Sequence, residues 1–189
     1  MEYEVLGFPP DGPSLTLDWQ AFSYAGKFEM TNTGKAVLRS NDEIVAAAAF
    51  NGDRETPEQA WIRYMTVKTE RQGEGLGTEL ARRLTETLFD HEYERVTIAV
   101  NNPIAYRALS KAGYHFTGRE TGVAELVLEA PGERDPDSYR AGLTLFANRD
   151  LPEREQEPVA SWLEEAELPP TVNGIPFAPS TEREDNGTR

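Results

Sequence analysis

The chain has 189 residues, with 33 Asp and Glu against 19 Lys and Arg, a formal net charge of -14 and no cysteine. Without cysteine, thiol nucleophiles, thiolate zinc sites and structural disulfides are excluded. The negative charge argues against a general affinity for nucleic acid or anionic membranes, because both repel an acidic surface. The composition resembles the acidic surfaces of proteins from salt-loving organisms, so we expect a halophilic archaeal source, with an ordinary acidic bacterial protein as the alternative.

Two features of the sequence indicate where the protein is located. The first residues, Met1 to Glu4, carry acidic side chains and lack the basic and apolar segments of a signal peptide. No stretch of about 20 apolar residues occurs in the sequence. We therefore expect a cytoplasmic protein that has neither a membrane nor nucleic acid as its partner.

The N-terminal part of the chain predicts antiparallel strands. The opening segment ends in a turn rich in proline and glycine, from Pro9 to Pro13. Residues 14–30 fit neither period well, so a short helix starting near Asp18 and an irregular strand both remain open. We predict three strands after this segment, at residues 35–39, 43–50 and 61–67.

The apolar period changes after the third of these strands. Leucines recur every fourth residue from Leu76 to Leu88, which predicts a helix over residues 76–90. A strand follows at 95–100, and a strand, helix and strand of this length form a βαβ crossover with parallel strands. The remaining predicted elements are a helix at 103–112, strands at 114–118 and 124–129, and helices at 138–147 and 153–165.

These elements predict an α/β fold, in detail α+β, with a mixed and mostly antiparallel sheet around one parallel βαβ crossover. Flanking helices cover the sheet, and a helical extension follows it. The composition shifts to Gly, Glu, Arg, Asp and Pro beyond Pro131. We expect a main domain at 1–130, a helical C-terminal extension at 131–168 and a flexible tail at 169–189.

A glycine-rich loop, Gln72-Gly73-Glu74-Gly75-Leu76-Gly77, joins the third strand to the first helix. Backbone amides and the helix dipole bind phosphate in this geometry. A Walker loop is excluded, because the helix continues with Thr78 and Glu79 where that loop has Lys and Ser or Thr. A Rossmann fingerprint fits poorly, since it would have a third glycine at Thr78 and a parallel sheet from its start. A tight turn without a ligand stays open.

The loop and a second segment resemble the signature motifs of the GNAT superfamily of N-acetyltransferases. Gln72, Gly75 and Gly77 match a motif of Gln or Arg, two residues, Gly, one residue, then Gly or Ala. About 25 residues later, Asn102-Pro103-Ile104-Ala105 and Lys111-Ala112-Gly113-Tyr114 look like the family's second motif. The resemblance covers residues 34–129. It implies a GNAT-like fold and acetyl-CoA as cosubstrate. No pair of His and carboxylate has metal-binding spacing, so we expect no metal.

The resemblance also implies where acetyl-CoA binds. The pantetheine arm would lie in a gap between two splayed parallel strands, the loop would wrap the pyrophosphate, and Lys111 or Arg107 would meet the nucleotide phosphates. Asn102 would lie near the pantetheine. The residues expected to bind the cofactor are Met65, Val67, Gln72, Gly73, Glu74, Gly75, Leu76, Gly77, Thr78, Asn102 and Lys111.

The catalytic groups are less evident. Many family members use a tyrosine four residues before the helix-ending glycine as the general acid, and this chain has Leu109 there. Tyr106 lies one helical turn earlier and is our candidate acid; the alternative is that it packs against CoA or the core. The backbone NH of Val67 is the candidate oxyanion donor. The groups considered for the base are Glu29, Glu58, Tyr64 and Asn101.

We expect an N-acetyltransferase that transfers acetyl to a primary amine of a small molecule, a lysine side chain or a peptide N-terminus. The amine would attack directly, without a covalent enzyme intermediate. An acidic rim would favour a cationic amine, such as a polyamine, an aminoglycoside or lysine. The alternative is a non-catalytic acyl-CoA-binding or interaction module, and the C-terminal helices could build a homodimer.

Overall fold

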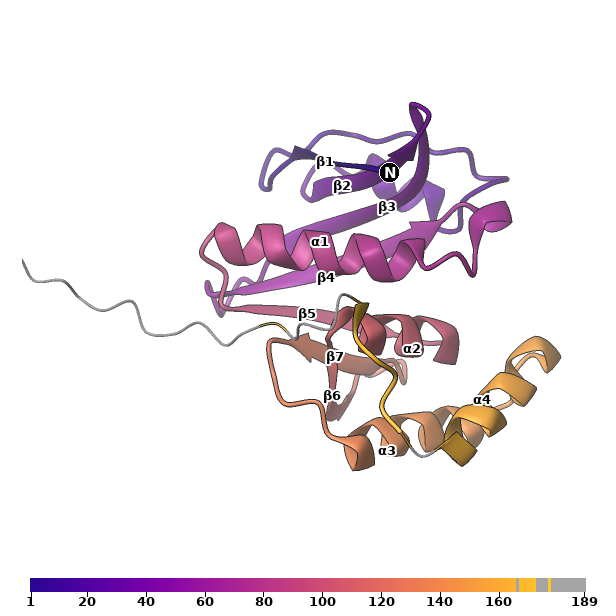
Figure 1. The fold of residues 1–189 in the computed structure, drawn as a ribbon. Coiled ribbons are helices and arrows are strands. Elements are labelled where there is room, and N and C mark those ends of the chain that lie inside the picture. Colours follow the sequence, from indigo (N-terminus) through magenta and orange to yellow (C-terminus); the bar gives the residue numbers. More distant parts are fainter. Residues whose placement is uncertain (166, 173–176, 178–189) are drawn as a thin grey trace, which may run out of the picture.

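The computed structural model describes residues 1–165, 167–172 and 177. A seven-stranded sheet runs through it in the order β1-β2-β3-β4-β5-β7-β6 (Figure 1). The strands are β1 (Glu2–Gly7), β2 (Gly34–Ser40), β3 (Glu43–Gly52), β4 (Gln59–Val67), β5 (Arg95–Val100), β6 (His115–Glu120) and β7 (Leu126–Ala130). The helices are α1 (Leu76–Asp90), α2 (Pro103–Ala112), α3 (Pro136–Ala147) and α4 (Glu153–Glu165), with short 3-10 turns η1 (Ala25–Glu29) and η2 (Thr69–Arg71).

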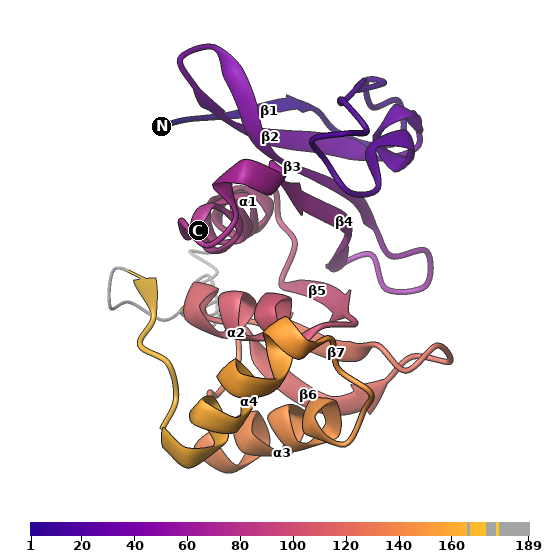
Figure 2. The ribbon, with the colours of Figure 1, turned by 90° about the vertical axis from the view of Figure 1, so that its right-hand side faces the viewer.

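The sheet is mixed, as the sequence predicts. Every neighbouring pair of strands is antiparallel except β4 and β5, which α1 connects. Helices α1, α2 and α3 pack on one face of the sheet, and α4 lies outside them against α2 and α3 (Figure 2). We call this face the helix face and the opposite one the open face. None of the described helices is long and apolar enough to cross a membrane.

The main core lies between the sheet and the helices that cover its helix face. The leucine repeat of α1 provides its centre, with Leu80, Leu84 and Leu88 fully buried. Leu143 and Phe146 of α3 belong to the same cluster. The helical extension therefore packs on the core of the sheet. Most of the tail from residue 169 lies outside the described residues, but Phe177 is described and packs edge-on against Phe89 and Tyr114.

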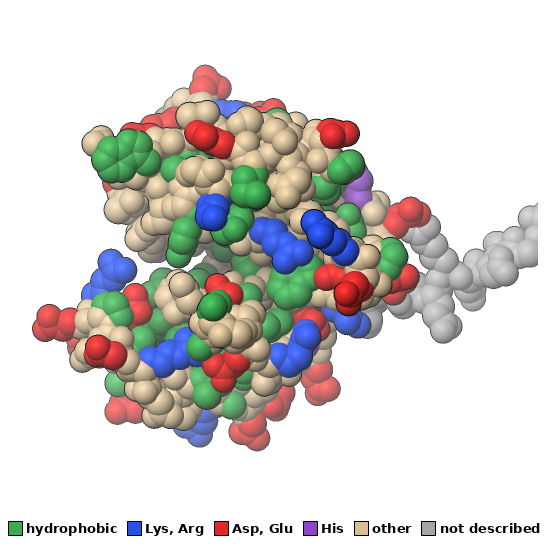
Figure 3. Space-filling model, turned by 180° about the vertical axis from the view of Figure 1, so that it is seen from behind, with side chains coloured by type: hydrophobic (Ala, Val, Ile, Leu, Met, Phe, Trp, Pro, Cys, Tyr) green, Lys and Arg blue, Asp and Glu red, His purple; other side chains and the backbone are tan. Residues whose placement is uncertain are grey.

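The open face is only partly covered. Residues 8–33 cross it beside β2, β3 and β4 and bury a smaller cluster that includes Phe28 and Ala47. Lys35 secures this segment, because its buried Nζ donates to the carbonyls of Met30 and Thr33 at 2.7 and 2.8 Å. The rest of the face is hollowed between the part that carries β1 to β4 and the part that carries β5 to β7 (Figure 3).

Sequence periodicity predicted the centre of the fold better than its N-terminus. The predicted ranges 76–90, 95–100 and 103–112 coincide with α1, β5 and α2. Strand β1 was not predicted, although its first four residues, Glu2 to Val5, alternate between exposed and half-buried side chains. Neither alternative for residues 14–30 is correct in full. The carbonyl of Asp18 accepts the amides of Ala21 and Phe22 in a turn, and η1 follows.

Candidate functional site

Strand β4 has an open backbone edge in its second half. Its first four residues, Gln59 to Ile62, pair with β5. From there β4 continues along β3 as far as Val67, whereas β5 continues along β7 as far as Val100. No described strand pairs with residues 63–67 on the β5 side. An unpaired strand edge of this kind can bind an extended ligand through main-chain hydrogen bonds.

A β-bulge at Arg63 marks the point where the strands separate. Phe50 pairs with Ile62 and Ala49 with Tyr64, so Arg63 is an extra residue in β4. Ile62 belongs to the core of the helix face, whereas Tyr64 packs with the cluster on the open face. Arg63 also reaches the open face, where its Nε donates to Asn51 Oδ1 at 2.7 Å. The bulge therefore presents two successive side chains to the open face and bends the strand away from β5.

The glycine-rich loop connects β4 and η2 to α1. Gly73 and Gly75 have φ angles of 88° and 82°, which are left-handed and costly for a residue with a side chain. A Cβ on either glycine would have no atom within 4 Å, so the backbone faces open space. Gly75 is the N-cap of α1 and provides no side-chain cap. Among the described residues, no group accepts the amides of Gly73, Glu74 or Gly75. Together with the helix dipole, these amides are suited to binding an anion, and we call residues 73–75 the candidate anion site.

The charged residues of the loop are paired with each other. Arg71 Nε donates to both carboxylate oxygens of Glu74, at 2.7 and 2.8 Å. This hydrogen bonding lowers the pKa of the Glu74 carboxyl, so the residue stays ionised. Because Arg71 offsets the charge of Glu74, the loop can accept an anion despite carrying an acid.

The remaining predicted loop residues have mixed roles. Gln72 precedes the turn in extended backbone, and the buried side chain of Leu76 belongs to the core. The hydroxyl of Thr78 donates to the carbonyl of Ala108 at 3.1 Å, which ties α1 to α2. The side chains of Leu76 and Thr78 are therefore not available to a phosphate. The backbone amides of Leu76, Gly77 and Thr78, in the first turn of α1, are suited to one, as are those of the candidate anion site.

The open edge and the candidate anion site are next to each other. A Cβ on Gly77 would lie 3.5 Å from Val67 Cγ2 and 4.0 Å from Met65 Cε. The side chains of Met65 and Val67 therefore point toward α1 and pack against the main core. Their backbone groups are left at the open edge of β4.

The second motif has its polar groups at the ends of α2. Asn102 is the N-cap, and its Oδ1 accepts the amide of Ala105 at 2.8 Å. Lys111 lies in the last turn of α2, half-buried, with no ion pair or hydrogen bond to another described residue. Arg107 is engaged elsewhere. It donates to the hydroxyl of Tyr139 at 3.0 Å and to Glu165 at 3.1 Å, which argues against the phosphate contact expected for it.

Tyr106 is not where a catalytic acid would be. Its side chain is 1% exposed and stacks on Tyr139 at a centroid distance of 5.4 Å. Its hydroxyl donates to the Tyr139 carbonyl at 3.0 Å, and burial raises its pKa. The second alternative from the sequence, packing in the core, describes this placement. The reason is that α3 covers the face of α2 from which Tyr106 projects. Leu109, at the position of the family tyrosine, is fully buried as well.

Of the four groups considered for the base, Tyr64 alone comes from the separated part of β4. Its ring lies on the open face, 5.7 Å from the Nζ of Lys27. Glu58 precedes the paired end of β4, where its carbonyl accepts the amides of Glu94 and Arg95. Glu29 ends η1, and Asn101 follows β5 with its Oδ1 accepting from Asn102.

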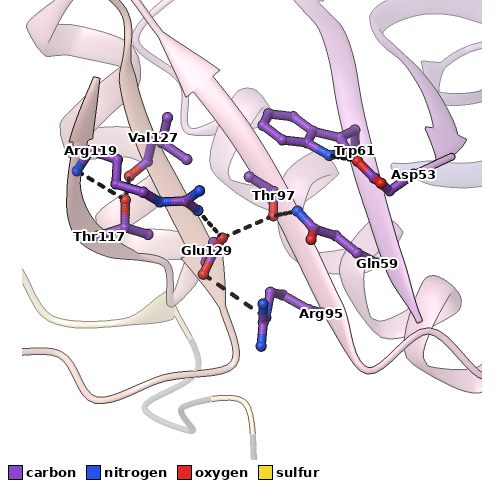
Figure 4. Close-up of polar contacts among 9 residues, drawn as sticks. All are labelled: Asp53, Gln59, Trp61, Arg95, Thr97, Thr117, Arg119, Val127 and Glu129. Carbon is purple, nitrogen blue, oxygen red and sulfur yellow. Dashed lines mark hydrogen bonds and ion pairs between the residues drawn. The ribbon is translucent and has the colours of Figure 1, made fainter. Parts of the chain in front are cut away.

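A row of polar side chains crosses the floor of the open face where the strands are still paired (Figure 4). Gln59 Nε2 donates to Thr97 Oγ1 at 2.7 Å, and Thr97 Oγ1 donates to Glu129 at 3.4 Å. Arg119 and Arg95 ion-pair with the two oxygens of Glu129. This row joins β4, β5 and β7 just below the separation. Sequence reasoning missed it because its members come from three strands.

Trp61 lies above this row, nearer to the bulge. Its indole Nε1 donates to Asp53 Oδ2 at 2.9 Å. The other oxygen of Asp53 accepts the amides of Glu55 and Thr56, and these hydrogen bonds lower the pKa of the carboxyl. The described residues contain no cluster of His, Asp or Glu that could hold a metal ion.

The sequence matches the family model described as the acetyltransferase (GNAT) family over residues 4–114. This range is more than half of the chain and contains the open edge of β4 and the whole glycine-rich loop. The comparison with curated proteins gives no match.

Solved structures with a similar fold include several acetyltransferases. The IAA acetyltransferase from Bacillus cereus ATCC 14579 is 14% identical, with 68% of this chain and 97% of that chain covered and a TM-score of 0.52. An N-acetyltransferase from Staphylococcus aureus Mu50 is 17% identical, with 51% and 66% covered and a TM-score of 0.46. A Bacillus subtilis acetyltransferase in complex with CoA is 16% identical, with 53% and 78% covered and a TM-score of 0.46. The match thus spans just under two thirds of the Staphylococcus aureus protein.

Proposed function

The chain belongs to the acetyltransferase (GNAT) family, and from this premise we propose that it transfers acetyl from acetyl-CoA to a primary amine. One observation carries the proposal. The open backbone edge at residues 63–67 leads directly into the candidate anion site at Gly73 to Gly75. A strand-like ligand with a diphosphate at one end fits this arrangement, and CoA has that chemistry.

The backbone of β4 provides the positioning. In our proposal, main-chain groups of Met65 and Val67 bond the pantetheine amides, and the amides at the start of α1 hold the diphosphate. Val67 lies about 13 Å from Arg63 along the strand. The thioester, at the far end from the diphosphate, would therefore lie near the bulge. Main-chain groups alternate along a strand, so the amides of Met65 and Val67 face the open edge while that of Tyr64 faces β3. Met65 lies nearer to the bulge, so its amide is a better oxyanion donor than the amide of Val67 first considered.

The reaction needs few groups from the protein. The neutral amine attacks the thioester carbon, the new C–N bond forms, and the C–S bond breaks to release the thiolate. A thiol has a pKa of about 8.5, so its thiolate can leave near neutral pH without a strong acid. With Leu109 in place of the family tyrosine and Tyr106 buried, no acid from α2 takes part. The amine proton passes to water on the open face, where the Tyr64 hydroxyl can relay it.

The test is acetyl-CoA consumption, measured by thiol release with pooled amines at low and high salt, together with CoA affinity by calorimetry. The informative variant is Gly75→Glu, which places a charged side chain at the candidate anion site. Gly118→Glu is the matched control, because Gly118 also has a positive φ, 77°, and open space around its Cβ position.

We expect amine-dependent thiol release from the wild type and from Gly118→Glu, and loss of both CoA binding and release in Gly75→Glu. CoA binding without release for any amine would favour the non-catalytic binding module. Absence of CoA binding in the wild type would overturn the proposal.

A further inference from the structure

Most basic side chains in the described part of this acidic chain bind a carboxylate or a backbone carbonyl. Most form ion pairs with carboxylates within 4.0 Å, and Lys35, Arg134 and Arg140 donate to backbone carbonyls. The described basic residues that have neither kind of partner are Lys27, Arg54, Arg63 and Lys111.

Three of these four cations lie on the open face around the bulge. Lys27 lies over the ring of Tyr64, and Arg63 lies over Trp61 with its guanidinium carbon 4.9 Å from the ring centroid. Arg54 is in the turn that leads into β4. Burial lowers the pKa of Arg63, the nearby charge of Asp53 partly offsets this, and the charge of Arg54 lowers it again, so both charged residues lie near Arg63. Basic side chains gather along the hollow of this face (Figure 3).

Two carboxylates on the open face, those of Asp53 and Glu129, are bound to other groups. Asp53 accepts two backbone amides with one oxygen and the indole of Trp61 with the other. Glu129 lies between Arg95 and Arg119 (Figure 4). Neither carboxylate forms an ion pair within 4.0 Å with Arg63 or Lys27, although the charge of Asp53 acts on Arg63 from a greater distance. Arg63 and Lys27 therefore have no direct carboxylate partner among the described residues of this acidic chain.

The guanidinium of Arg63 is held in a fixed orientation. Its Nε is bound to Asn51 Oδ1, and its plane rests on Trp61, which Asp53 anchors in turn. Its two terminal nitrogens have no acceptor among the described residues. A guanidinium held this way presents two parallel donors, the geometry that binds a carboxylate or phosphate oxygen pair.

We propose that the acceptor is a small amine that also carries an anionic group, bound by the terminal nitrogens of Arg63 with Lys27 as a second cation. This inference rests on the proposed acetyl transfer and names its substrate class. It reverses the cationic acceptor expected from the net charge, because that expectation averaged charge over the whole surface. The anionic group would be anchored beside the bulge, which leaves the amine of the same molecule free to reach the thioester.

The experiment compares acceptors in matched pairs that differ by one anionic group. β-Alanine is compared with β-alaninamide, and phosphoethanolamine with ethanolamine; putrescine represents cationic amines. Each is assayed with wild type, Arg63→Gln and Arg63→Lys, with kcat and KM determined separately. Arg154→Gln is the control, because it removes the same charge from an exposed residue of α4 paired with Glu155. Circular dichroism checks that each variant is folded.

We expect the anionic member of at least one pair to have the higher kcat/KM, and Arg63→Gln to reduce it by about 10- to 100-fold, mainly through KM. Arg63→Lys should recover only part of this, since it restores the charge without the two parallel donors. The preferred pair identifies a carboxylate or a phosphate as the anchored group. Higher kcat/KM for neutral amines or putrescine, with no effect of Arg63→Gln, would overturn the inference and leave acetyl transfer standing. Absence of thiol release with every amine would instead overturn the proposed function, and the inference with it.

Discussion

Replacing Tyr106 with Phe separates a structural role from a catalytic one. The substitution keeps the ring that stacks on Tyr139 and removes only the hydroxyl that donates to the Tyr139 carbonyl at 3.0 Å. A single neutral hydrogen bond contributes about 0.5–1.5 kcal/mol to the free energy of unfolding. In a chain of this size, a loss of 1 kcal/mol lowers Tm by about 2–4 °C. We therefore expect a small loss of stability and no change in kcat.

The measurement combines a thermal melt with thiol-release kinetics on the same preparations. If Tyr106 protonated the leaving thiolate, Tyr106→Phe would lower kcat by about 10²-fold or more while leaving Tm unchanged. That result would refute the structural role. Tyr106→Ala provides the comparison, because removing a buried aromatic ring costs about 3–5 kcal/mol whatever the hydroxyl does.

Three further predictions concern other buried groups. Thr97→Val should lower the free energy of unfolding in urea by about 1–3 kcal/mol, because the amide of Gln59 loses its acceptor; an unchanged midpoint would contradict this. Burial lowers the pKa of His115 from 6.5, so its uncharged form is favoured on folding, and stability should fall as pH drops below 6.5. Urea titrations across this range should show a weaker fall for His115→Gln, and an equal fall would exclude His115 as the cause. A Cβ on Gly142 would lie 2.2 Å from the Tyr106 hydroxyl oxygen. Gly142→Ala should therefore lower Tm by overpacking, costing about 1–3 kcal/mol despite the helix propensity of alanine, and a raised Tm would contradict the tight contact.

The sequence predicted those parts of the fold in which local pattern and tertiary packing agree. The leucine repeat from Leu76 to Leu88 gave α1 its bounds, because one face of the helix lies fully on the sheet. The glycine spacing predicted the turn before α1 for a similar reason, since positive φ at Gly73 and Gly75 is a local requirement. The family motifs depend on both features.

The remainder depends on contacts between distant residues. Helical spacing alone put Tyr106 one turn from the family's tyrosine position, but it could not show that α3 would cover that face of α2. The row of Gln59, Thr97 and Glu129 requires the strand order and register before its members become neighbours. The extra residue at Arg63 cannot be predicted from the sequence either, because the bulge depends on the pairing of β4 with β3.

The bulge at Arg63 also makes the site sensitive to the length of β4. Ile62 and Met65 pack on the helix face, and Arg63 and Tyr64 both reach the open face. Deletion of Arg63 would leave Ile62, Tyr64 and Met65 alternating as in a regular strand, so no core side chain would have to change sides. Without the bend, β4 could follow β5 to its end and close the open edge. In evolutionary terms, the loss of one codon could close the candidate site and leave a continuous sheet with its hydrophobic core intact.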